Sequence, residues 1–560
     1  MQKILFSVLL FIAANVQAQL NPYKYNNTKN VTANKAAVVS AHALASDAGL
    51  QMLKKGGNAF DAAIATQLAL AVVYPGAGNL GGGGFLVAHT AKGKNIALDY
   101  REKAPAKAFK DMYLDSEKNA ITKLSMEGQL ASGVPGTVAG LFATHKYAKL
   151  PFATLIAPAI KLAQKGFAVT AAQAADFNNS KAVFVRNNKN KVAFVKDNLW
   201  KTGDTLIQTD LANTLKRIRD FGKKGFYEGQ TAALIVAEMK NGNGIISLAD
   251  LKNYQVRERS IMQFTYKNVE VLTMPLPSSG GIIIQQLLKM TEQQKLSSMP
   301  FHSAASLQLI IEAERRAFAD RAEFMGDEDF VIVPVKTLVS DAYLQTRMAD
   351  FISLKAGNSK NISGGSVKES EQTTHISIVD NEGNAVAVTT TLNDHFGSKT
   401  IVSGAGFVLN NEMDDFSVKP GVPNMYGAIG NEKNAISPGK RMLSSMTPTI
   451  VLKNNKPYIV VGTPGGTTIP TSVFQSIVNM VDYNLSPADA VNKPKFHHQW
   501  LPDEVYVEKS FDADVIKQLE EMGYKIVTRG AIGRTELIEI KNKKIVAVAD
   551  KRGDDDARGY

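Results

Sequence analysis

The spacing of hydrophobic and polar residues divides the chain into regions with different predicted structure. From residue 137 to 348, apolar residues recur at the spacing of amphipathic helices. A polar, glycine-rich stretch, residues 356–372, is predicted to be an exposed linker. Beyond it, short runs of alternating apolar and polar residues predict strands. The chain therefore has a strand-rich C-terminal third and a helix-rich middle, in which the predicted helices are 155–164, 209–221, 231–239, 282–291 and 304–318.

A further helix is predicted over residues 62–73, where nearly every position is apolar, so this helix should be buried. The next segment, residues 76–81 with the sequence GAGNLG, formally matches a dinucleotide-binding motif. That motif needs a strand before it and a helix after it, whereas here a helix precedes and a predicted strand, 85–88, follows. We therefore interpret the segment as a tight, close-packed turn.

The first residues have the layout of a secretory signal peptide. Lys3 precedes an apolar run, residues 4–14, and Val16-Gln17-Ala18 provides small residues at a cleavage site. The apolar run is shorter than the roughly 20 residues that a spanning helix needs. We therefore expect residues 1–18 to be removed after Ala18. The mature protein should be periplasmic or secreted, with no membrane span.

Composition restricts the chemistry. The chain has 560 residues and no cysteine, which excludes disulfides, thiolate nucleophiles and thiolate metal sites. Any nucleophile must be oxygen or nitrogen. The net charge of +12 is dispersed, and its densest stretch, residues 181–201, carries no nucleic-acid-binding signature, so we interpret it as a solvated loop and strand face with no nucleic-acid partner. The eight histidines have no metal-ligand spacing, and we expect no metal.

The first two strands after the linker form a predicted hairpin. The first strand ends at Asp380 and the second begins after Asn384. If these two residues face each other across the turn, the register sets Thr373 opposite Thr391, so two hydroxyl groups meet near the open end of the hairpin. A slip of the pairing to Ala385 would move this register by one residue. Such a threonine pair is usually a packing or hydrogen-bonding ladder. Because this pair lies beside the predicted linker, it is also a candidate for a catalytic role.

Two other segments have both a functional and a plain structural interpretation. Gly465 and Gly466 lie between a predicted strand, 458–461, and a helix that begins near Pro470. Free backbone N–H groups at such a junction can bind an anion or an oxyanion, although a simple tight turn has the same sequence. The acidic residues of segment 410–415 are either cation ligands or a solvated loop, and the segment lacks the glycine spacing of a calcium loop.

Several separated motifs together resemble the γ-glutamyltransferases, also called γ-glutamyltranspeptidases. The longest are residues 372–377, QTTHIS, and residues 383–393, GNAVAVTTTLN. The resemblance extends from about residue 38 to the C-terminus; its other motifs are LDYREKAP (98–105), SGVPG (132–136), NNEMDDFS (410–417), LSSMTP (443–448) and TPGG (463–466).

The resemblance implies an α+β fold of the N-terminal-nucleophile hydrolase type, an αββα sandwich with two stacked sheets between helical layers. It also implies that the precursor cleaves itself between Gln372 and Thr373. The products would be a large subunit, residues 19–372, and a small subunit, residues 373–560, which stay together as an intertwined heterodimer.

The implied reaction transfers a γ-glutamyl group. Thr373 would attack the γ-carbonyl of a donor such as glutathione, and the resulting ester would pass to an amino acid, a peptide or water, without a cofactor. A hydroxyl is a weak nucleophile until a base takes its proton. The α-amino group freed by cleavage is a suitable base on the same residue, because the pKa of such a group is ordinarily about 7.7–8.0.

The resemblance also assigns roles to individual residues. The glutamyl group carries an α-carboxylate, which needs cationic or hydrogen-bond-donating partners, and an α-ammonium, which needs anionic or hydrogen-bond-accepting partners. By resemblance, Arg101, Ser444 and Ser445 bind its α-carboxylate; Asn393, Glu412 and Asp415 bind its α-ammonium; Gly465 and Gly466 form the oxyanion hole; Thr391 orients the nucleophile; and Tyr426 lies on a closing loop.

Two alternatives remain open on the sequence alone. A cephalosporin or glutaryl acylase of the same superfamily would use the same Thr373 chemistry on an acyl group that lacks the α-amino group. Asn393, Glu412 and Asp415 argue against this alternative. A non-catalytic periplasmic binding scaffold would keep the pocket without cleaving itself.

Overall fold

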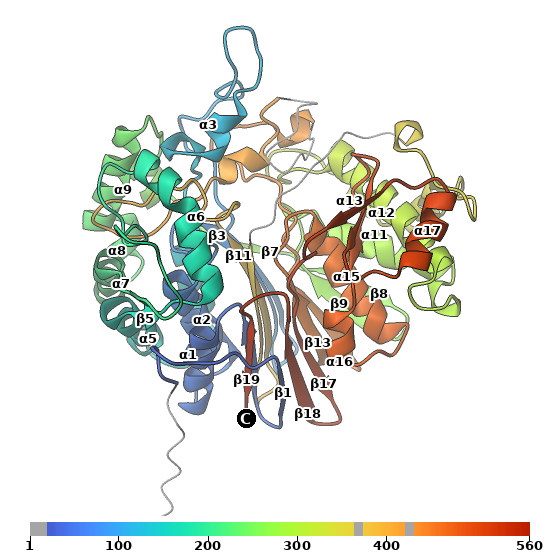
Figure 1. The fold of residues 1–560 in the computed structure, drawn as a ribbon, viewed down its shortest axis with the longest axis horizontal. Helices are drawn as coiled ribbons and strands as arrows, with labels where there is room; N and C mark the ends of the chain where they lie inside the picture. Colours follow the sequence, from blue (N-terminus) through green and yellow to red (C-terminus); the bar gives the residue numbers. More distant parts are fainter. Residues whose placement is uncertain (1–19, 363–372, 420–430) are drawn as a thin grey trace, which may run out of the picture.

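The computed structural model describes residues 20–362, 373–419 and 431–560, and these form a four-layered sandwich. Two sheets stack face to face between two layers of helices, as Figure 1 shows. This is the αββα arrangement expected from the resemblance, and the predicted α+β class is confirmed.

The first sheet mixes strands from both sides of the proposed cleavage point. All of its neighbouring strands are antiparallel. In spatial order the seven strands of this sheet that lie in the described residues are β19 (Asp556–Gly559), β2 (Ala37–Ser40), β10 (Thr374–Val379), β11 (Ala385–Thr391), β3 (Gly83–His89), β4 (Asn95–Asp99) and β7 (Arg257–Arg259).

The second sheet is also antiparallel and interleaved. Over the same described residues its order is β1 (Asn30–Ala33), β18 (Lys544–Ala549), β17 (Glu536–Lys541), β13 (Lys456–Gly462), β12 (Thr449–Lys453), β9 (Val269–Thr273) and β8 (Met262–Tyr266). The smaller strands are β5 (Phe167–Ala168) with β6 (Thr205–Leu206), and β14 (Phe496–His497), β15 (Val505–Glu508) and β16 (Ile526–Arg529).

Helices cover the outer faces of both sheets. The layer on the first sheet, at the left of Figure 1, contains α1 (Ala43–Lys54), α2 (Ala59–Val73), α5 (Phe152–Lys165), α6 (Ala171–Asn187), α7 (Thr209–Phe221), α8 (Lys224–Tyr227) and α9 (Gly229–Asn241), with the short α3 (Thr122–Met126) above them. Helix α4 (Thr137–His145) contacts α2 and β3, and the short α10 (Leu248–Lys252) contacts α8 and α9. The other layer contains α11 (Gly280–Gln293), α12 (Ala304–Phe324), α13 (Val335–Leu338), α14 (Asp341–Arg347), α15 (Thr468–Val481), α16 (Pro487–Asn492) and α17 (Ala513–Glu521).

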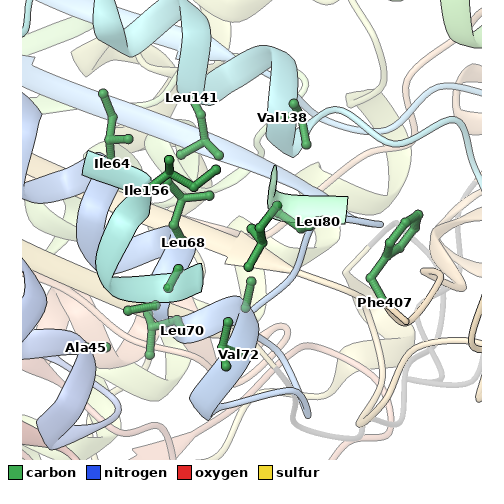
Figure 2. Close-up of a cluster of buried hydrophobic side chains, with 14 of the residues drawn as sticks. Ala45, Ile64, Leu68, Leu70, Val72, Leu80, Val138, Leu141, Ile156 and Phe407 are labelled. Carbon is green, nitrogen blue, oxygen red and sulfur yellow. The ribbon is translucent and has the colours of Figure 1, made fainter. Parts of the chain in front are cut away.

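Side-chain alternation along the strands separates the two largest cores. Ile376 and Ile378 of β10 pack into the core under α1 and α2, whereas Val379 packs into the core shared by the two sheets. Helix α2 is buried along its whole length, as its apolar sequence predicts, and Asn58 caps it. Figure 2 shows its side chains Ile64 and Leu68 close to Leu141 and Ile156 of neighbouring helices.

The hairpin register agrees with the prediction. Asp380 N–H donates to Asn384 O at 3.1 Å, and Thr374 pairs with Thr390 along β10 and β11. Extending the register by one residue sets Thr373 opposite Thr391. In turn, Thr391 pairs with Gly83 of β3. The nucleophile candidate therefore lies at one end of the central strands of the first sheet.

All five helices predicted in the middle of the chain are present, each as long as predicted or longer: α5, α7, α9, α11 and α12.

The interpretation of residues 181–201 as a loop and strand is wrong, because α6 continues through Asn187 and the segment that follows contains no strand. Phe184, Phe194 and Trp200 of this segment are buried. Phe194 stacks on Phe177, Trp200 also packs against Phe177, and Phe184 contacts Phe396 edge to face. Their rings pack the protein core.

The prediction of an exposed linker holds only in part for residues 356–362, because Asn358, Lys360 and Asn361 are exposed but Ser359 is buried. Ser359 is 1% exposed, its backbone N–H donates to Asp503 Oδ2 at 2.8 Å, and its carbonyl accepts from Trp500 Nε1 at 3.0 Å. Ile362 is buried as well. Residues 356–362 are therefore anchored by contacts to a segment about 140 positions later. Residues 363–372, including Gln372, lie outside the described residues.

The predicted signal peptide, residues 1–18, also lies outside the described part of the chain. Among the helices of residues 20–362, 373–419 and 431–560, none has the length and apolar content needed to cross a bilayer.

Candidate active site

Thr373 lies directly before β10 and is 5% exposed. The hairpin register brings it opposite Thr391, whose hydroxyl accepts a hydrogen bond of 2.8 Å from the backbone N–H of Asn393. Asn393 has φ of 78°, so the chain turns sharply after β11. This turn sends the Asn393 amide toward the acidic segment, where it donates to Asn411 O at 3.2 Å.

Arg101 follows β4 and is 1% exposed. Asp99, the last residue of that strand, accepts the Arg101 backbone N–H at 2.9 Å and fixes the turn. The guanidinium contacts Glu412 Oε2 and Asp415 Oδ2, each at 2.5 Å. The structure therefore brings the predicted carboxylate-binding arginine into direct contact with two of the predicted ammonium-binding residues.

A third carboxylate, that of Glu102, belongs to this cluster, with Oε2 3.6 Å from Arg101 Nη1. Burial raises the pKa of Glu102 to about 8, and it raises the pKa values of Glu412 and Asp415 as well, although the Arg101 charge opposes all three shifts. One guanidinium faces three desolvated carboxyl groups. The cluster therefore has more carboxyl groups than its one cation can balance, and a second cationic group bound there would favour their ionised form.

The acidic segment is buried, so its interpretation as a solvated loop is wrong. Glu412 to Asp415 form a short 3-10 helix, and Glu412 is fully buried. Asn410 anchors it, donating to Gly81 O and Gly133 O and accepting from the Glu412 N–H. In the described residues, no group of three or more histidine, aspartate or glutamate side chains is arranged to hold a metal ion.

Ser444 and Ser445 lie on the chain segment next to Arg101, which donates to the carbonyl oxygens of Met442 and Leu443, both at 3.4 Å. Sequence reasoning missed a second arginine here. Arg321 of α12 donates from Nε to Ser279 Oγ at 3.1 Å and from Nη2 to Ser445 Oγ at 3.4 Å. It comes from a helix more than 120 residues upstream of Ser445, and no local motif marks it.

Gly465 and Gly466 occupy the turn between β13 and α15, with φ values of 134° and 56° that favour glycine. The Gly465 carbonyl accepts from Thr468 N–H at 3.0 Å, within the first turn of the helix. Because a trans peptide points its N–H opposite to its carbonyl, the Gly466 N–H points away from that helix. Gly465 and Thr373 line the same cavity, of about 140 Å³.

The cavity also contains residues that sequence reasoning did not select, among them His395 and Arg534. His395 lies only four positions after Thr391, which was the single local signal available. Tyr426, predicted to lie on a closing loop, is outside the described residues.

Comparison with known proteins identifies relatives over nearly the whole chain. The gamma-glutamyltranspeptidase family matches residues 45–560. A glutathione hydrolase proenzyme of Escherichia coli strain K12 is 46% identical over 538 residues, covering 95% of this chain and 93% of the relative.

Solved structures are similar as well. A cephalosporin acylase from Bacillus halodurans superposes with a TM-score of 0.85 at 26% identity, covering 97% of this chain and 99% of that chain. The gamma-glutamyltranspeptidase of Helicobacter pylori is 43% identical, with a TM-score of 0.57 over 61% of this chain and 97% of that chain.

Proposed function

This chain belongs to the gamma-glutamyltranspeptidase family, and we propose that it cleaves γ-glutamyl amides such as glutathione through an ester on Thr373. The γ-glutamyl group then passes to an amino acid, a peptide or water. The observation that carries the proposal is the buried cluster of Arg101 with Glu412 and Asp415, because it offers both charges that a glutamyl α-carbon requires.

The reaction begins with self-cleavage between Gln372 and Thr373. The freed α-amino group takes the proton of the Thr373 hydroxyl, and the oxygen attacks the γ-carbonyl carbon. The bond from this carbon to the leaving nitrogen breaks, and the nitrogen receives the proton. The N–H groups of Gly465 and Gly466 stabilise the charge on the carbonyl oxygen, while the Thr391 hydroxyl orients the nucleophile.

Donor recognition divides between the two charges. Arg101, Ser444 and Ser445 receive the α-carboxylate, and Asn393, Glu412 and Asp415 receive the α-ammonium. The guanidinium already contacts Glu412 and Asp415, so a substrate carboxylate would take the place of the Asp415 carboxylate while the contact with Glu412 is kept. From the family resemblance alone, we also propose that Tyr426 contacts the bound donor.

The two fragments, residues 19–372 and 373–560, stay together as a heterodimer. Strands β10 and β11 of the small fragment lie between β2 and β3 of the large one, and this interleaving supports the proposal. Separating them would expose the hydrogen-bonding edges of both partners.

The protein is exported, periplasmic or secreted, after removal of residues 1–18. The signal-like N-terminal sequence supports this location. Protein sequencing of the large fragment should begin at Gln19, and fractionation should recover it outside the cytoplasm. Retention of Met1 in a washed membrane fraction would contradict the proposal.

A denaturing gel tests the function. Wild type should give two bands, with the smaller fragment starting at Thr373, and should release p-nitroaniline from γ-glutamyl-p-nitroanilide. Thr373→Ala should remain one band and be inactive. Thr374→Ala is the matched control, because the Thr374 hydroxyl has no hydrogen-bond partner in the described residues, and it should still cleave.

The same assay separates the alternatives. An acylase would prefer glutaryl-p-nitroanilide, which lacks the α-amino group, over the γ-glutamyl compound. A binding scaffold would remain one full-length band in the wild type. Either result would overturn the proposed function.

A further inference from the structure

We propose that the cavity at Thr373 binds the acceptor of the transfer reaction, with Arg534 receiving its carboxylate and Asp176 its amino group. This inference rests on the proposed function. The cavity has a volume of about 140 Å³, and Thr373 and Gly465 form part of its wall. It therefore opens where the ester would form.

The cavity is distinct from the charged cluster that would bind the donor. Arg101, Glu412 and Asp415 do not line it. A γ-glutamyl group bound to Thr373 would extend its α-carbon toward those residues. The cavity then lies beside the reacting carbon and is open to the group that replaces the leaving amine.

Arg534 is held so that part of its guanidinium remains available. Its Nη2 donates to the Tyr74 hydroxyl at 2.6 Å, and the guanidinium carbon lies 5.2 Å from the centre of the Tyr74 ring. Nε lies 3.8 Å from Asp555 Oδ1, beyond hydrogen-bond distance, and the side chain is 20% exposed. A guanidinium with free donors in a fixed position is suited to bind a carboxylate.

Asp176 supplies the opposite charge. Its side chain is 42% exposed, and Oδ2 lies 3.3 Å from His395 Nε2. The His395 ring lies against the backbone of Gly76, where a Cβ would come within 2.4 Å of the ring. The glycine turn that resembles a dinucleotide motif therefore makes room for this ring, and Tyr74, two residues before this turn, positions Arg534.

One cationic and one anionic side chain match an amino acid or a short peptide, which carries one charge of each sign. The acceptor ammonium would lose a proton to solvent before attack. Its nitrogen would then attack the ester carbonyl carbon, the bond to Thr373 Oγ would break, and one of the two protons left on the amine would pass to Thr373 Oγ, while the other stays on the new amide nitrogen. The products are a new γ-glutamyl amide and the free hydroxyl.

Two acceptors that differ only in the carboxylate test the proposal. Self-cleaved enzyme is supplied with γ-glutamyl-p-nitroanilide, whose leaving group has no carboxylate, and with glycylglycine or glycylglycinamide. The readout is the ratio of transfer efficiencies for the two acceptors. Wild type should prefer glycylglycine by about tenfold or more, the effect of one charge-assisted hydrogen bond.

The variants should change this preference in different ways. Arg534→Gln should bring the ratio of transfer efficiencies near one. Tyr74→Phe should cause a smaller decrease in this ratio, because Arg534 loses its hydroxyl partner. Asp176→Asn should raise the KM of both acceptors, which share the amino group, and leave the ratio unchanged. Arg529→Gln is the matched control, since Arg529 also stacks on a tyrosine, Tyr506, at 5.5 Å but outside the cavity.

An unchanged ratio in Arg534→Gln overturns the inference, provided that the variant gives two fragments. If that variant fails to cleave itself, an unchanged ratio in Tyr74→Phe together with an unchanged acceptor KM in Asp176→Asn overturns it instead. Failure of the wild type to release p-nitroaniline would reject the proposed function itself, and the two failures are thereby distinguished.

Discussion

The carboxylate of Glu412 approaches the guanidinium of Arg101 to 2.5 Å, although the two side chains are 0% and 1% exposed. Removing both charges from water costs several kcal/mol per ion, which their attraction offsets only partly. Apolar residues of similar volume are often as stable or more stable at such positions. The pair is therefore better explained by recognition of a charged ligand than by stability.

Replacing Arg101 with lysine should weaken donor binding. Lysine keeps the charge but cannot form two parallel N–H bonds to a carboxylate. Loss of one hydrogen bond to a charged group costs about 1.5–3 kcal/mol, so the donor KM should rise by roughly 10- to 150-fold. The measurement is turnover of γ-glutamyl-p-nitroanilide across donor concentration, together with the fragment pattern on a gel.

Arg316→Lys is the matched control for this substitution. Arg316 is also buried and contacts two carboxylates, Glu312 at 2.7 Å and Asp350 at 2.6 Å, but outside the cluster. Normal self-cleavage with an unchanged donor KM in Arg101→Lys would reject the role of Arg101 in binding the carboxylate.

Replacing Thr391 with valine should slow both self-cleavage and turnover. Valine has nearly the same shape but no hydroxyl, so the nucleophile loses an orienting hydrogen bond and Asn393 N–H loses its acceptor. We expect fragment formation to slow by roughly 2- to 10-fold, the range of a neutral hydrogen bond. Thr391→Ser retains the hydroxyl and should cleave faster than the valine variant; equal rates would contradict the assignment.

Local patterns predict the hairpin well. Alternation in β10 and β11 and the turn between Asp380 and Asn384 are sufficient to set Thr373 opposite Thr391, and the observed strand pairing has this register. Helix α6 is not predicted because its apolar and polar residues do not separate clearly onto two faces and it buries few side chains, so its amphipathic signal is weak. A capping box at Thr170 and Gln173 is the signal that could have found it.

Contacts between distant segments could not be predicted in the same way. Arg321 reaches Ser445 from another helix, and Trp500 anchors Ser359 within the predicted linker. No sequence pattern near either partner predicts these two contacts. The motif residues of the site were found through the family resemblance, which carries information that spacing and periodicity lack.

A buried carboxyl group outside the active site should make stability depend on pH. Burial raises the pKa of Asp556 to about 7, although Arg558 opposes the shift. An unfolded aspartate has a pKa of about 3.9. Between these values the folded protein holds the proton more tightly, so the free energy of unfolding should fall as pH rises from about 4 to 7.

Asp556→Asn should flatten this dependence, because asparagine does not titrate and its side-chain oxygen can still accept from Thr28 N–H. The measurement is urea unfolding at several pH values in the uncleaved Thr373→Ala background. Asp197→Asn, at a side chain that is 95% exposed, is the control. An equal slope in Asp556→Asn and in this control would contradict the prediction.

The last prediction concerns Arg321, a positioning residue that the sequence did not mark. Its guanidinium donates to Ser279 Oγ and Ser445 Oγ, and its charge lies near Asp415, where it lowers the carboxyl pKa against the effect of burial. Arg321→Gln should leave Ser445 poorly oriented toward the donor carboxylate. The donor KM should rise by about tenfold, the range of one charge-assisted hydrogen bond, with a smaller change in kcat.

A donor that lacks the α-carboxylate separates positioning from a general structural effect. With 4-aminobutyryl-p-nitroanilide, which keeps an amino group but has no carboxylate for Ser445, Arg321→Gln should turn over at nearly the rate of the wild type. Arg321→Lys restores the charge and should recover part of the affinity for the γ-glutamyl donor. Equal losses with both donors would show that Arg321 supports the fold of this region and does not act through Ser445.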